Sequence, residues 1–150
     1  HKSEESGYIP SLLHSARRIN NKVTEFVVEK TIDFLNKENK TNTNSSVLIF
    51  GYTFKENCSD IRNTKVKDIY EGLLKEEYEV AIYDPYISVK KGNIFVNNPF
   101  ENNQKYDVII VAVAHEEFLN YSYSDFLQLS KGKLVLLDIK GIYKESTWKL

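Results

Sequence analysis

Apolar residues between Leu12 and Leu35 recur every three or four positions, which is the spacing of one face of an α-helix. Pro10 and Ser11 suit its start, because proline fits a first turn and serine caps free N–H groups. About 24 helical residues at 1.5 Å each span about 36 Å. A helix of this length needs a partner along it. The apolar positions are Leu12, Ala16, Ile19, Val23, Phe26, Val27, Phe34 and Leu35.

The stretch from Asn36 to Ser46 carries no apolar side chain. We therefore expect a solvated connection there, since a polar segment has nothing to bury. This places a boundary in the chain. Residues 1–45 are predicted to hold the long helix and a polar linker, and residues 46–150 an α/β domain.

Strand and helix patterns alternate after this boundary. Val47 to Gly51 reads as a strand, Thr64 to Glu77 as a helix with one apolar face, and Glu79 to Asp84 as a second strand. Two strands joined by a helix form a βαβ unit, in which the strands are parallel.

The run from Tyr106 to Ala114 lacks alternation, as expected for a strand that is covered on both faces. A short helix from about Ser124 to Leu129 and a strand from Leu134 to Leu137 follow, and Ile94 to Val96 is a candidate for a further short strand. Four or five strands with intervening helices predict a Rossmann-like, doubly wound α/β fold with a mostly parallel sheet, preceded by one long α-helix.

The composition excludes several classes of partner. The 150 residues suffice for one domain with a core, and 20 Lys+Arg against 21 Asp+Glu create no overall field that would attract nucleic acid or a membrane. The single cysteine excludes an internal disulfide and a cysteine-rich metal cluster, and we predict no metal site.

The longest apolar run, Val108 to Ala114, is too short to cross a bilayer, and the amino terminus has no signal-peptide pattern. We therefore expect a cytoplasmic protein. The chain contains no methionine and starts at His1, which indicates that another segment precedes it in the natural protein.

Positively charged residues lie where the first strand meets the following helix. Lys55 and Arg62 flank this turn, and Lys140 follows the last predicted strand at the same edge of the sheet. Open α/β sheets bind ligands beyond the carboxyl ends of their strands, and a helix amino terminus adds free N–H groups. The arrangement is typical of a pyrophosphate site. The alternative is that Lys55 and Arg62 pair with Glu56 and Asp60 on a solvated surface.

Other candidate residues favour structural roles. Gly51 stands alone without a G-x-G-x-x-G pattern, so this domain is not expected to be the main dinucleotide binder. For Asp84 we favour a turn over a ribose contact. Cys58 is a candidate nucleophile to which the sequence assigns no histidine, and a small buried thiol is the commoner case. For His115 we expect a packing or supporting role.

The segment Gly51 to Val66, GYTFKENCSDIRNTKV, resembles the signature that opens the carboxyl-terminal domain of nucleotide-sugar 6-dehydrogenases. The resemblance continues through Tyr83-Asp84-Pro85, through Val111 to His115 with Phe118, and through Asp138 to Gly141. Ala16 to Asn20 is similar to the start of that family's central helix, so the resemblance covers nearly the whole chain.

The form FKENC-x-DIRN resembles the branch that oxidises UDP-N-acetylhexosamines more than the branch that oxidises UDP-glucose. The resemblance implies oxidation of the sugar's C6 alcohol to a carboxylate with two NAD+. It also implies that NAD is held mainly by an amino-terminal Rossmann domain and that a catalytic cysteine precedes the central helix, both of them before the start of this chain. The chain alone is then expected to be inactive and to contain no catalytic residue.

Carried over by position, the resemblance implies that Phe54 and Lys55 contact the UDP-sugar, that Lys140 meets its nucleotide portion, and that Arg62 reaches NAD across the domain cleft. Ser59 stands where the branch usually has proline. Because serine does not fix the backbone angle φ as proline does, we expect this turn to be slightly looser.

Two other functions stay open at this point. One is a nonenzymatic nucleotide-binding or regulatory module. The other is assembly, in which the long helix packs on its counterpart in a twofold homodimer. The sequence does not distinguish between the epimers of the N-acetylhexosamine.

Overall fold

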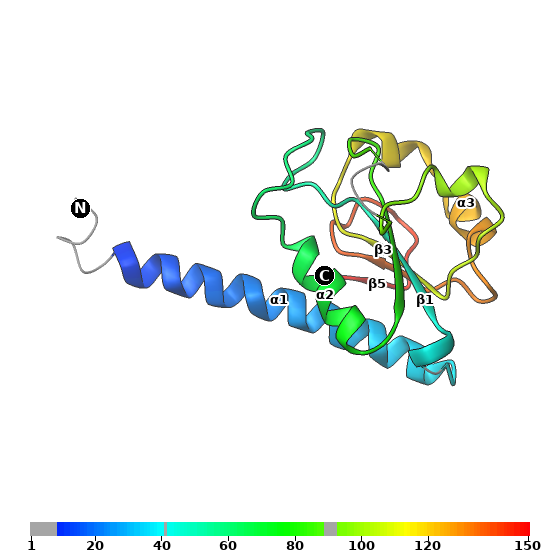
Figure 1. The fold of residues 1–150 in the computed structure, drawn as a ribbon, viewed down its shortest axis with the longest axis horizontal. Helices are drawn as coiled ribbons and strands as arrows, with labels where there is room; N and C mark the ends of the chain where they lie inside the picture. The colour runs from blue at the N-terminus through cyan, green and yellow to red at the C-terminus, as the bar shows by residue number, and fades with distance from the viewer. Residues whose placement is uncertain (1–8, 41, 89–92) are drawn as a thin grey trace.

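The computed structural model describes residues 9–40, 42–88 and 93–150, and within them five parallel strands form one sheet in the order β2-β1-β3-β4-β5 (Figure 1). The strands are β1 Ser46–Phe50, β2 Glu79–Tyr83, β3 Val108–Val111, β4 Leu136–Asp138 and β5 Trp148–Lys149. The helices are α1 Ile9–Lys37, α2 Val66–Lys75 and α3 Tyr123–Gln128, with short 3-10 helices η1 Asn42–Asn44, η3 Pro99–Glu101 and η4 Glu116–Asn120.

Both faces of the sheet are covered. Successive strand residues point to opposite faces, so Val47 and Ile49 join the core beneath α1 and α2, while Leu48 and Phe50 join the core beneath η4 and α3. All five residues of β1 are buried. The predicted Rossmann-like, doubly wound α/β fold is therefore confirmed.

The strand order reverses between β1 and β3. From β1 the chain crosses to β2 on one side, and it then returns to place β3 on the other side of β1. The connections that leave the carboxyl ends of β1 and β3 therefore diverge, which opens a crevice at that edge of the sheet.

Only the carboxyl-terminal half of α1 is packed. Val27, Thr31 and Leu35 are buried against the sheet and α2, whereas the amino-terminal half projects beyond the domain (Figure 1). There Leu12 and Ile19 are 64% and 61% exposed. The helix is also longer than predicted, with 29 residues. Residues of α1 belong to the same hydrophobic core as residues of the sheet. The division of the chain at residue 45 into a helix with its linker and an α/β domain therefore stays a prediction.

The polar connection is not solvated throughout, contrary to expectation. Ser45 and Ser46 are buried, and the N–H of Ser46 donates to Asp107 Oδ2 at 2.8 Å. Lys40 Nζ lies 2.6 Å from the other oxygen of Asp107. The first residues of a central strand enter the core whatever their polarity, and their backbone groups need partners there.

The candidate strand at Ile94 to Val96 is reduced to a single bridge in the structure. Phe95 forms a single isolated bridge with Ile82, flanked by two backbone hydrogen bonds of 2.8 Å. The fifth strand is instead β5, which pairs with the end of β4 and places Trp148 against Phe26 of α1 at 5.7 Å between ring centroids. A two-residue strand has no periodicity from which it could be predicted.

Candidate functional site

A pocket of about 270 Å³ opens in the crevice at the carboxyl edge of the sheet. Its walls come from the turn after β1, from the segment that enters α2, from Ala112 and Val113 after β3, and from Lys140 after β4. Phe54, Lys55 and Lys140, which the sequence singled out, all line it. Arg62 is not among the lining residues.

The turn after β1 requires glycine at its first position. Gly51 has φ of +89°, and a Cβ on it would lie 2.5 Å from Val113 Cβ. Its N–H donates to Tyr83 O at 2.8 Å, which ties the turn to the end of β2. The lone glycine thus serves the close approach of two strand ends.

Asp84 accepts hydrogen bonds from the backbone of the turn after β1, in agreement with the structural role predicted for it. Its Oδ2 accepts the N–H groups of Tyr52 and Thr53 at 2.7 and 3.1 Å, and its Oδ1 accepts that of Tyr86 at 2.9 Å. Burial alone would raise the pKa of Asp84, but the hydrogen bonds from His115 and from these N–H groups outweigh it, so the pKa is lowered.

Asp138 does the same for the turn that carries Lys140. This buried carboxylate ends β4 and accepts the N–H groups of Gly141 and Tyr143, each at 2.9 Å. Gly141 has φ of +65°, a conformation that glycine adopts without strain. Each of the two predicted lysines therefore lies on a turn anchored by an aspartate at or just after the end of a strand.

The pocket contains a third lysine that the sequence analysis did not single out. Lys65, at the start of α2, lies beside Lys55 and Lys140 in the lining. Its Nζ is 3.1 Å from Asn21 Oδ1 and 3.5 Å from Asp68 Oδ2. The sequence could have indicated Lys65 as a site residue, because it lies at the start of the predicted helix, at the edge of the sheet where the strands end. Three lysines against one glutamate, Glu56, line the pocket at a helix amino terminus, and this balance of charge favours an anion.

Lys55 and Arg62 differ in their partners. Within the part of the chain that the structure describes, Lys55 forms no salt bridge, and it lies exposed at the rim of the pocket. Arg62 is 84% exposed and pairs with Asp60 through two contacts of 3.0 and 3.1 Å. This hydrogen bonding lowers the pKa of Asp60 to about 2. The local-pair alternative thus holds for Arg62 but not for Lys55, and contact of Arg62 with NAD stays a prediction.

Cys58 and His115 both support the turn. The thiol of Cys58 donates to Lys55 O at 3.3 Å, as does the hydroxyl of Thr53 at 2.9 Å. The ring of His115 is fully buried and bonds with Asp84 and with the N–H of Asn57. This is the supporting role that the sequence predicted for His115.

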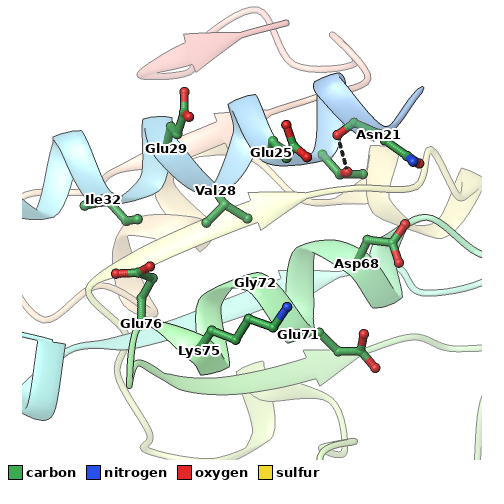
Figure 2. A pocket seen from close by; sticks show the side chains of 11 residues that line it. Asn21, Glu25, Val28, Glu29, Ile32, Asp68, Glu71, Gly72, Lys75 and Glu76 are labelled. Atoms are coloured by element: carbon green, nitrogen blue, oxygen red, sulfur yellow. Dashed lines mark hydrogen bonds between the residues drawn. The ribbon is translucent and has the colours of Figure 1, made fainter. Parts of the chain in front are cut away.

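Further hollows adjoin α1. One, of about 660 Å³, shares Phe54 and Lys65 with the pocket and is also lined by Arg17. Another, of about 270 Å³, has mostly apolar walls and shares Lys65 and Lys140 with the pocket. Figure 2 shows a third, a groove of about 480 Å³ between α1 and α2 whose walls include Glu25, Glu29 and Glu71. Carboxylates repel phosphate, so the pocket lined by lysines is the better anion site.

The described residues contain no cluster of three or more acidic, histidine or cysteine side chains that could hold a metal ion. Among the same residues, no helix combines the length and apolar character needed to cross a membrane.

Residues 48–145 match the model of the UDP-glucose/GDP-mannose dehydrogenase family, UDP binding domain. The chain belongs to this family. The match contains all the lysines of the pocket, and it confirms the resemblance seen in the Gly51 to Val66 segment.

Curated relatives within the UDP-glucose/GDP-mannose dehydrogenase family include two UDP-N-acetyl-D-glucosamine 6-dehydrogenases. That of Salmonella typhi is 39% identical over 147 residues, which is 95% of this chain and 34% of the relative. That of Pseudomonas aeruginosa is 36% identical over 150 residues, which is 97% of this chain and 35% of the relative. The chain thus spans about a third of the length of these enzymes.

Solved structures of the family share the fold. The UDP-N-acetyl-mannosamine dehydrogenase from Staphylococcus aureus matches with a TM-score of 0.75 at 26% identity, over 95% of this chain and 34% of its own. The UDP-D-ManNAc dehydrogenase from Pyrococcus horikoshii matches with a TM-score of 0.79 at 24% identity, over 92% of this chain and 32% of its own. The latter supports the fold alone.

Proposed function

We propose that this chain is the UDP-binding portion of an NAD-dependent dehydrogenase that oxidises the C6 alcohol of a UDP-N-acetylhexosamine to a carboxylate. The observation that carries the proposal is the pocket in the crevice between β1 and β3, which Lys55, Lys65 and Lys140 line within the region that matches a UDP binding domain. A pyrophosphate carries two negative charges, and ammonium groups at a helix amino terminus complement them.

Each predicted site residue has a role in this proposal. Lys55 and Lys140 bind the pyrophosphate, and Phe54, which is 58% exposed at the rim, packs against the UDP-sugar. Arg62 extends from the same loop toward NAD. In the whole enzyme a separate amino-terminal domain would hold NAD+, two molecules of which would accept the two hydrides of the oxidation, and water would supply the second oxygen of the carboxylate. The catalytic cysteine would lie outside this chain. The isolated chain has no activity in this proposal, and the whole enzyme is cytoplasmic.

Calorimetric titration of the chain with UDP and with UDP-N-acetylglucosamine at low salt tests the proposal. Lys55→Ala removes one charge-assisted contact, so we expect roughly tenfold weaker binding. Lys133→Ala is the matched control, because Lys133 is 75% exposed and pairs with Glu38 at 3.3 Å, away from the pocket. Equal affinities of Lys55→Ala and wild type would contradict the assignment of the pocket.

We also propose that α1 joins two copies of the chain into a homodimer. Its projecting half combines exposed Leu12 and Ile19 with the basic Arg17 and Arg18. Its packed half borders the acidic groove of Figure 2. An antiparallel pair of α1 helices sets the basic half of each against the acidic half of the other, which supports a twofold arrangement.

A further inference from the structure

The loop that carries Phe54 and Lys55 is fastened at both ends to His115. The ring of His115 is fully buried just beyond β3, and its Nε2 lies 3.0 Å from Asp84 Oδ2 and 3.2 Å from Thr53 Oγ1. Its Nδ1 accepts the N–H of Asn57 at 2.9 Å. Thr53 and Asn57 bracket the segment that forms the rim of the pocket.

These partners determine the protonation of the ring. A backbone N–H only donates, so Nδ1 must present its lone pair to Asn57. A carboxylate accepts, so the hydrogen lies on Nε2 and points to Asp84. The hydroxyl of Thr53 donates to Lys55 O at 2.9 Å and is therefore free to accept from Nε2. The network requires a neutral imidazole.

The Asn57 end of the loop depends on His115 and its neighbour. Asn57 has φ of +56°, and its Oδ1 accepts the N–H of Glu116 at 2.9 Å. Phe54 N–H donates to Asp60 O at 2.6 Å, which closes the loop on itself. The loop is thus a closed turn, joined to the rest of the domain by the Asp84 and His115 side chains and by the Asn57 side chain.

We propose that His115 is a positioning residue for nucleotide-sugar binding, which in its neutral form holds the 53–57 turn so that Lys55 and Phe54 face the ligand. This rests on the proposed function of the pocket. A second proton on the ring occupies Nδ1, so Asn57 N–H loses its acceptor and that end of the turn is released. The pair with Asp84 survives this change. Anion binding then weakens as the pH falls.

Few titratable side chains contact the His115 ring. Among the residues that the structure describes, the titratable side chains in contact with it are Asp84 and Tyr86, the latter with ring centroids 4.8 Å apart. The β1 loop contributes Thr53 and Asn57, and η4 contributes Phe118 at 5.1 Å, all of them uncharged.

Titration with UDP-N-acetylglucosamine from pH 8 to pH 5 tests the proposal. This ligand is chosen because its pyrophosphate lacks the terminal phosphate ionisation of UDP, which has a pKa of about 6. We expect the wild-type affinity to fall roughly five- to tenfold, as for loss of one or two hydrogen bonds. In His115→Gln the amide keeps a donor and an acceptor but gains no proton, so its affinity stays flat with pH.

Two controls accompany this titration. His14→Gln alters an exposed histidine of α1 and should keep the wild-type profile. Asn57→Gly keeps both the backbone N–H and the positive φ, so it should also keep the pH dependence even where binding is weaker overall. Parallel pH profiles for wild type and His115→Gln would overturn the proposal.

Nuclear magnetic resonance of the ¹⁵N-labelled wild-type chain separates this proposal from the function of the pocket. If the wild type binds no nucleotide sugar at any pH, the proposed function fails for the isolated chain, and the spectra still decide the role of His115. A hydrogen on Nε2, and an Asn57 amide that shifts in step with the ring as the pH falls, support it. A hydrogen on Nδ1, or an Asn57 amide that does not follow the ring, overturns it.

Discussion

At the residue scale, Gly51 shows how one backbone position controls the pocket. Its φ is +89°, and a Cβ added to it would lie 2.5 Å from Val113 Cβ, so both conformation and space exclude a side chain. Any shift of Gly51 or Val113 moves the two strand ends that form the crevice. The residue therefore couples stability to the shape of the pocket.

We expect Gly51→Ala to destabilise the chain by about 2–4 kcal/mol, because it adds backbone strain to a steric overlap. Gly132→Ala is the control, since a Cβ there meets nothing within 4 Å, and it should change stability by less than about 0.5 kcal/mol. Urea unfolding of both variants measures the difference. A Gly51→Ala variant as stable as Gly132→Ala would show that the loop relaxes without cost.

At the scale of elements, Asp107 joins three segments at the opposite edge of the sheet. Its carboxylate accepts Ser46 N–H at 2.8 Å and pairs with Lys40 at 2.6 Å and Lys131 at 3.0 Å. It thereby links the end of α1, the start of β1 and the loop before β4. Burial alone would raise the pKa of Asp107, but these hydrogen bonds, that from Lys40 foremost, lower it.

The lowered pKa of Asp107 makes the folded chain less stable in acid. Because the folded pKa of Asp107 lies below that of the unfolded chain, the stabilisation is complete above about pH 5 and is lost progressively as the pH falls through the unfolded and then the folded pKa. We expect Asp107→Asn to cost about 2 kcal/mol at pH 7, a moderate figure because Lys40 and Lys131 are partly exposed.

Thermal unfolding of Asp107→Asn between pH 3 and pH 7 should show a shallower loss of stability in acid than the wild type. Asp33→Asn, at an exposed position of α1, is the matched control and should follow the wild type. Identical acid profiles for Asp107→Asn and wild type would refute the linkage.

At the scale of the whole molecule, the projecting half of α1 decides the proposed assembly. Ile19 on α1 and Leu119 on η4 are both 61% exposed, so they form a matched pair of apolar surface residues. Analytical ultracentrifugation at tens of micromolar should show a dimer for the wild type and for Leu119→Asp, and a monomer for Ile19→Asp, because a charge in an apolar contact is costly. A wild-type monomer at this concentration would contradict the role of α1.

The sequence by itself determined the features that depend on local spacing. Helix-face periodicity located α1 and α2, continuous apolar runs located β1 and β3, and the Gly51 to Val66 segment indicated the family. These signals are short-range, because helix and strand periods span only a few residues. The position of Lys55 and Lys140 at strand ends followed from the rule that parallel strands end at one edge of a sheet.

The tertiary structure alone decided which groups meet across the chain. It brought Lys65 into the pocket and left Arg62 paired with Asp60 outside. It joined Asn57 to His115, 58 residues apart, and Lys40 to Asp107, 67 residues apart. Contacts of this range depend on strand order and on the buried groups that compete for each hydrogen bond, and neither is encoded in the local pattern of residues.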